Sequence, residues 1–117
     1  MSHGATRTYT NLGAGLSAVI TPTWGDLCAL HATNENAGVR FLQLFDRATA
    51  LSGGEVPKLS FPIAAGTAAA PGALILDSGF WDGRVFNNLG IVYGFSTTEG
   101  TYTAATDGEH SINVLFT

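Results

Sequence analysis

Residues 26–45, DLCALHATNENAGVRFLQLF, are the stretch that decides the expected fold. Residues 26–33 alternate between an apolar face and a mixed face, as in a strand with one buried side. Residues 33–38 are turn formers, and the alternation resumes over residues 39–45. Two strands that a short polar loop joins predict an antiparallel hairpin.

Further strands are expected on both sides of this stretch. They cover segments of alternating or continuous apolar character: 12–20, 58–63, 73–76, 89–96 and 109–116. Pro62 favours an edge position for its strand, since proline cannot donate to a ladder. Residues 77–88 are dense in Gly, Asp, Asn and aromatic residues, which indicates a structured loop with one helical turn.

The composition agrees with an all-β fold. Val, Ile, Thr and aromatic residues number 37, against ten for Glu, Lys, Arg and Gln, the long helix formers. The 117 residues match the size of one domain. Six to eight short strands predict a single antiparallel β-sandwich, jelly-roll-like or Ig-like. Residues 1–11 are expected to form an extended N-terminal arm or an edge strand, and residues 12–117 the sandwich.

The charge pattern excludes two classes of partner. The net charge is −4 and the five basic residues are scattered, so neither nucleic acid nor a membrane surface is an expected partner. No run approaches the roughly 18 apolar residues of a membrane-spanning helix. Only 12% of the residues are charged, against about 25% in typical domains. Such a surface is either a compact Thr-, Ser- and Gly-rich one or one that partners cover in part.

Cys28 is the single cysteine, so the chain has no internal disulfide and is not a secreted disulfide scaffold. It lies in an apolar run and is expected to be a small core residue. The first ten residues have no apolar signal core, which predicts synthesis and folding in a cytoplasm.

No catalytic, cofactor or metal site is expected. His3, His31 and His110 are not spaced as zinc ligands, and Gly-x-Ser-x-Gly and phosphate-loop patterns are absent. Residues 34–36 and 106–109 gather carboxylate and amide oxygens but match no calcium-loop spacing. We therefore expect a protein that is not an enzyme.

Four aromatic residues near predicted loops leave two interpretations open. They either fill the core under a long loop or form a platform on which a sugar stacks: Trp24, Phe80, Trp81 and Phe86.

Three motifs resemble a known family. Residues 41–49, FLQLFDRAT, follow an Asn-rich turn and match aromatic-Leu-x-Leu-aromatic-Asp-Lys/Arg-Ala-Thr. Residues 57–63, PKLSFPI, match Pro-x-Leu-x-x-Pro-Ile, and residues 89–98 match x-Gly-Ile-x-Tyr followed by Ser/Thr-Thr. Over about two-thirds of its length the chain resembles small β-sandwich virion proteins of tailed bacteriophages. Residues 80–83 and the N-terminal arm depart from the family pattern.

The resemblance implies a structural protein of a phage particle, without a cofactor. The expected role is a capsid decoration, or cement, protein that bridges major capsid subunits. A neck, collar or tail component and a glycan- or receptor-binding module are the alternatives. The expected partners are the major capsid protein or other virion subunits and further copies of the chain, in a trimer, assembled in the bacterial host cytoplasm. The expected partner contacts lie in the arm and in the loop at 80–86: Arg7, Tyr9, Phe80, Trp81, Arg84 and Phe86.

Overall fold

Short segments of alternating apolar residues produce an all-β structure with one helical turn. The computed structural model describes residues 7–12, 16–23, 25–81, 89–106 and 108–117. In chain order the elements are β1 (Arg7–Leu12), β2 (Ser17–Thr21), β3 (Leu27–Asn34), β4 (Arg40–Phe45), β5 (Leu59–Ile63), β6 (Gly72–Leu76), α1 (Ser78–Trp81), β7 (Ile91–Ser96) and β8 (His110–Phe116). Within these ranges no helix is long and apolar enough to cross a membrane.

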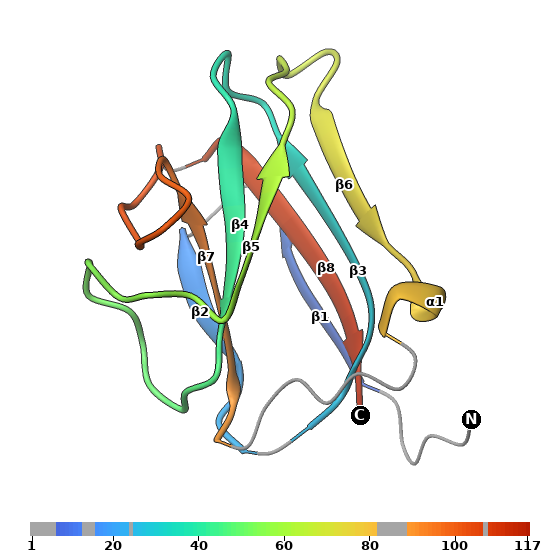
Figure 1. The fold of residues 1–117 in the computed structure, drawn as a ribbon. Coiled ribbons are helices and arrows are strands. Elements are labelled where there is room, and N and C mark those ends of the chain that lie inside the picture. Colours follow the sequence, from blue (N-terminus) through green and yellow to red (C-terminus); the bar gives the residue numbers. More distant parts are fainter. Residues whose placement is uncertain (1–6, 13–15, 24, 82–88, 107) are drawn as a thin grey trace.

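The strands form two four-stranded antiparallel sheets that pack face to face (Figure 1). One sheet has the order β1-β8-β3-β6 and the other has the order β2-β7-β4-β5. Strands at mirrored places in the chain pair with each other: β1 with β8, β2 with β7, β3 with β6, and β4 with β5. This is a long hairpin rolled over on itself, the jelly-roll form of a β-sandwich. The expected all-β sandwich is confirmed, and its topology is jelly-roll rather than Ig-like.

The core fills the space between the two sheets. Tyr93 and Phe95 of β7 are its largest fully buried side chains. The other fully buried members come from inward positions of four strands and from the residue that ends β5: Leu30, Ala32, Leu42, Leu44, Ile63, Ile91, Ile112 and Val114. Burying each large member stabilises the fold by about 1.5–3 kcal/mol. The inward and outward positions follow the alternation in the sequence.

The expected hairpin between residues 26–33 and 39–45 is wrong, because β3 and β4 lie in different sheets. The segment between them crosses the edge of the sandwich instead of turning back within one sheet. Each strand buries one face against the common core, with Leu30 on β3 and Leu42 on β4. A hairpin would bury the same residues, so the alternation in the sequence cannot distinguish the two arrangements.

The side chain of Asn34 holds this crossing in place. It is fully buried, and its amide nitrogen donates to the carbonyl oxygens of Gly38 (2.9 Å) and Ala64 (3.2 Å). Its oxygen accepts a hydrogen bond from the backbone N–H of Asn36 (2.9 Å). One side chain therefore ties the end of β3 to the turn that follows it and to the chain just beyond β5.

The N-terminal strands differ from the expected boundaries. Residues 1–11 were expected to form an extended arm or an edge strand, and the edge strand holds for residues 7–11. They belong to β1, which pairs with β8 from Arg7 opposite Phe116 to Leu12 opposite Ser111, so the sandwich does not begin at residue 12. The single strand expected over 12–20 is also wrong, because β1 ends at Leu12 and β2 begins at Ser17. Residues 1–6 lie outside the described part of the chain.

Three local expectations are confirmed. β5, which contains Pro62, is an edge strand of its sheet. One helical turn, α1, follows β6 in the segment expected to be a structured loop. Cys28 is buried, as expected for a small core residue.

We predict that Asn34→Ala lowers the free energy of unfolding by about 2–3 kcal/mol, because buried backbone groups lose their partners. Urea denaturation measures this as a lower midpoint with an unchanged slope. The matched control is Asn113→Ala, at a half-buried asparagine on the outer side of the same sheet, which is expected to cost less than about 0.5 kcal/mol. Equal costs at the two positions would contradict the role given to Asn34.

Candidate functional site

The two sheets differ in what covers their outer sides. On the β2-β7-β4-β5 sheet the chain supplies its own cover. The Gln43 amide nitrogen, on the outer side of β4, donates to the carbonyl oxygens of Thr98 (2.8 Å), Glu99 (2.9 Å) and Thr101 (3.2 Å). Tyr102 of the same loop is buried against Phe45 in a second small apolar cluster.

The outer side of the β1-β8-β3-β6 sheet carries no such cover among the described residues. We call its outward positions the outer face: Thr8, Ala29, His31, Thr33, Ala73, Ile75, Ser111, Asn113 and Leu115. None of these side chains is a lysine, arginine, aspartate or glutamate. Ile75 is 70% exposed and Leu115 is 40% exposed, so the face presents apolar side chains to solvent.

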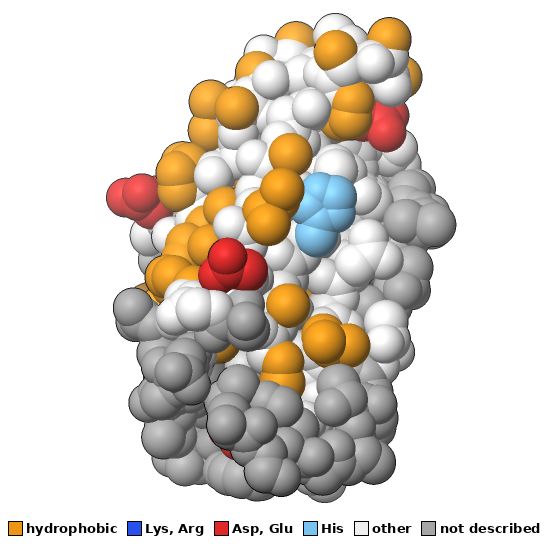
Figure 2. Space-filling model, turned by 90° about the vertical axis from the view of Figure 1, so that its right-hand side faces the viewer, with side chains coloured by type: hydrophobic (Ala, Val, Ile, Leu, Met, Phe, Trp, Pro, Cys, Tyr) orange, Lys and Arg blue, Asp and Glu red, His pale blue; other side chains and the backbone are white. Residues whose placement is uncertain are grey.

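The strand register sets the layout of the outer face. His31 at its centre lies opposite Asn113 on one side and Ile75 on the other. The hydroxyls of Thr33 and Ser111 hydrogen-bond to each other across the strands. Figure 2 shows hydrophobic side chains around a histidine on the side of the molecule that carries β6, with no lysine or arginine in view among the described residues.

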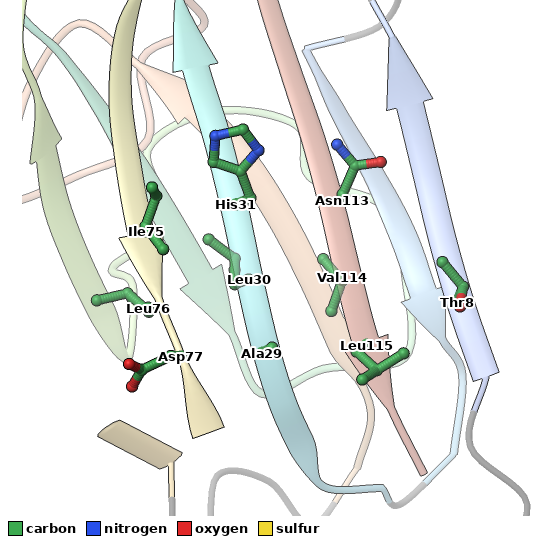
Figure 3. A pocket seen from close by; sticks show the side chains of 10 residues that line it. All are labelled: Thr8, Ala29, Leu30, His31, Ile75, Leu76, Asp77, Asn113, Val114 and Leu115. Carbon is green, nitrogen blue, oxygen red and sulfur yellow. The ribbon is translucent and has the colours of Figure 1, made fainter. Parts of the chain in front are cut away.

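A shallow hollow of about 320 Å³ lies on this face (Figure 3). Its lining comes from all four strands and from the residue after β6: Thr8, Ala29, Leu30, His31, Ile75, Leu76, Asp77, Asn113, Val114 and Leu115. Asp77 is the single charged residue among them and lies at the end of β6. A broad, open and nearly uncharged hollow fits a protein surface better than a small charged ligand.

A second hollow, of about 570 Å³, lies beside the turn after β4. Arg47 Nη1 is 3.2 Å from Glu55 Oε2, and the Asp46 carboxylate accepts a hydrogen bond from the backbone N–H of Leu89 (2.8 Å), so each charged group of this hollow has a partner within the chain. Hydrogen bonds from the backbone, chiefly from the Ser52 N–H and also from Gly53, lower the pKa of Glu55 to about 2. These contacts hold the loop to itself, so we place the candidate site on the outer face.

The six expected partner contacts fall into three groups. Arg7 and Tyr9 lie in β1, at the edge of the sheet that bears the outer face. Phe80 is half-buried, with its ring 5.8 Å from that of Phe61. Arg84 and Phe86 lie outside the described residues.

The prediction that Trp81 contacts a partner is wrong. Its side chain is 4% exposed and packs edge to face against Phe80 and Phe61, so it closes one end of the core. A buried indole cannot meet a partner or stack on a sugar. Of the two interpretations offered for the aromatic residues, core filling holds for Trp81, while Trp24 lies outside the described part of the chain.

The outer face itself was missed in the sequence. A usable signal was present, because no charged residue occurs between Leu59 and Leu76 and the outward positions of β3 and β8 also lack charge. These uncharged positions form one surface only if β3 pairs with both β6 and β8, and the expected hairpin between β3 and β4 excluded that pairing.

The histidines are separated in the fold. His31 is exposed on the outer face, whereas His110 at the start of β8 is 4% exposed and its ring stacks on Phe95 at 4.6 Å. Among the described residues, no group of three or more His, Cys, Asp or Glu is placed to hold a metal ion.

Comparisons with protein-family models, with curated protein sequences and with solved structures find no match to this chain.

His110 is expected to make stability depend on pH. Burial lowers its pKa, with a further lowering by Arg40 and an opposing influence of the Thr106 backbone and of Glu109 and Glu35. The folded protein thus binds this proton less readily than the unfolded chain. We predict that the free energy of unfolding falls as the pH drops below about 6.5, by up to about 1.4 kcal/mol per pH unit.

Urea denaturation between about pH 7.5 and about pH 5.5 measures this dependence. His110→Leu is expected to flatten the slope, whereas His31→Asn, at the exposed histidine, is expected to retain it. A slope that His110→Leu leaves unchanged would contradict the assignment.

Proposed function

We propose that the protein is a non-enzymatic structural component of a bacteriophage particle and that its role is capsid decoration. The observation that carries this proposal is the outer face, a bare and uncharged sheet surface on a chain that covers its other sheet itself. The resemblance of residues 41–49, 57–63 and 89–98 to virion proteins supplies the kind of partner.

The chemistry of the outer face suits a protein neighbour. Covering charged groups costs free energy, whereas covering apolar surface yields about 25 cal/mol per Å². The outer face combines the exposed side chains of Ile75 and Leu115 with the small polar groups of Thr33 and Ser111. Major capsid subunits that meet at such a face gain buried area, and a shell bridged in this way resists the pressure of packaged DNA.

The fold is compatible with this role but does not single it out. Jelly rolls occur in viral capsid proteins, and also in lectins and cupins. A neck, collar or tail component would use the same face with another symmetry. We do not propose the glycan-binding alternative, because Trp81 is in the core. The partners proposed are the major capsid protein or other virion subunits and further copies of the chain, within the virion assembled in the host cytoplasm.

We predict that Leu115→Glu weakens binding to capsids at least tenfold, because it places a charge within the proposed interface. The measurement is co-sedimentation of purified protein with empty mature capsids of a tailed phage that carries the gene for this chain. Val56→Glu is the matched control, since Val56 is 76% exposed and lies away from the outer face. If both variants bind like the wild type, the outer face is not the capsid interface.

A test of the N-terminal residues as a capsid anchor must leave β1 intact, so the truncation has to stop before residue 7. Deleting residues 1–11 would remove most of β1 and thus an edge of the sheet. Deleting residues 1–6 leaves β1 in place, and loss of capsid binding in that variant would support an anchoring role for those residues. Unchanged binding would assign the contact to the sandwich alone.

A further inference from the structure

The sandwich has four edge strands, β1, β6, β2 and β5, and they are not equally protected. Edge strands carry unpaired backbone groups, and proteins blunt them with proline, charge or irregular pairing. β5 contains Pro62. β2 pairs irregularly between Val19 and Thr21, and β1 begins with the charged residue Arg7.

β6 has none of these devices. Its register with β3 is continuous from Gly72 opposite Asn34 to Leu76 opposite Leu30. Its sequence, GALIL, contains no charge and no proline. In Figure 1 β6 is the outermost strand of its sheet, and α1 follows it on the same side of the molecule. Because hydrogen bonding alternates along an antiparallel pair, every second residue of β6 points its N–H and C=O away from β3.

The chain leading into β6 and the strand itself are also uncharged, and Asp77 directly after β6 is the first charged residue. No charged residue occurs from Leu59 to Leu76, and within this stretch Ala64, Ala65, residues 67–71, Ala73 and Ile75 are exposed. At this edge two molecules can meet without placing charged groups against each other.

We propose that β6 pairs antiparallel with β6 of a second copy of the chain, so that the β1-β8-β3-β6 sheets of two copies join into one eight-stranded sheet. This is addition of a strand to an open sheet edge, with a two-fold axis that makes the contact self-complementary. The proposal does not rest on the role in the virion.

The register follows from the symmetry. A two-fold axis at Leu74 pairs all five residues of the strand and keeps every side chain on its own face. Ala73 then lies opposite the partner's Ile75, and Gly72 opposite the partner's Leu76. A small residue faces a large one at each of these pairs, which is the packing that cross-strand neighbours favour. An axis at Ile75 would instead leave Gly72 unpaired and place Asp77 opposite the partner's Ala73.

The self-complementary register favours a second copy as the occupant of this edge. Each molecule carries a net charge of −4, which opposes association over most approaches. Along Gly72–Leu76, however, two copies place no charged side chains opposite each other. A basic partner strand would instead need acidic residues to pair with, and the strand has none before Asp77.

Sedimentation equilibrium tests the proposal on the full chain. The wild type is expected to reach a mass of twice 12.1 kDa as the concentration rises. The double variant Ala73→Lys, Ile75→Lys places like charges directly opposite each other on both sides of the axis and is expected to remain a monomer. Both side chains are exposed, so the fold should persist, which circular dichroism checks.

A matched double variant tests the register. In the variant Ala73→Glu, Ile75→Lys, the glutamate at position 73 of each copy faces the lysine at position 75 of the other copy. The opposite charges attract, so this variant is expected to form the dimer. Hydrogen exchange should show amides of residues 73–76 exchanging more slowly in the wild type and in this variant than in the double lysine variant. Leu115→Lys, on the outer face but away from the edge, is expected to leave the dimer intact.

Several results would overturn the proposal. One is a wild type that stays a monomer, or forms a trimer, at every concentration. Another is an equal mass for the two double variants. A third is loss of the dimer in Leu115→Lys but not in the double lysine variant, which would indicate that the outer faces stack on each other. Capsid binding by the monomeric variant is a separate result. If the monomeric variant binds capsids, the decoration proposal is unaffected. If a protein that still dimerises does not bind capsids, the result contradicts the decoration proposal and leaves the dimer proposal unaffected.

Discussion

The structure depends on one crossing between sheets, and the buried amide of Asn34 fixes it. At the end of β3 this side chain binds the turn at Asn36 and Gly38 and the chain after β5 at Ala64. A hairpin would bury the same apolar positions, so the tie made by Asn34 acts together with the pairing of β4 to β5 and β7 in the other sheet. Because β4 crosses, β8 and β6 become the neighbours of β3, and the outer face is assembled from strands far apart in the sequence.

A second consequence is the asymmetry between the two outer sides of the sandwich. One sheet is covered by loops that the Gln43 amide nitrogen and Tyr102 hold down, so the chain itself buries much of that outer side. The other sheet leaves Ile75 and Leu115 in solvent and has no outward charge on its described strands. The outward positions of that sheet and the strand β6 at its edge are thus uncharged. We propose that assembly uses these two surfaces.

Local pattern predicted the elements of the fold well and their partners poorly. Alternation identified Leu30, Leu42, Ile112 and their neighbours as core, and Pro62 marked an edge strand, because these are properties of single segments. The pairing of β3 was mispredicted, since register and sheet membership depend on tertiary contacts such as those of Asn34. Trp81 was expected at a partner surface because loop aromatics serve both roles, and only packing against Phe61 and Phe80 decides between them.

The central claim is that the outer face of the β1-β8-β3-β6 sheet is the surface through which this protein joins a particle. Cryo-electron microscopy of empty mature capsids incubated with the purified chain tests it most directly. The account predicts regular density over the shell, with the sheet that contains His31 and Leu115 against the capsid subunits. Density with that sheet facing solvent, or density confined to the vertex, neck or tail, would contradict it.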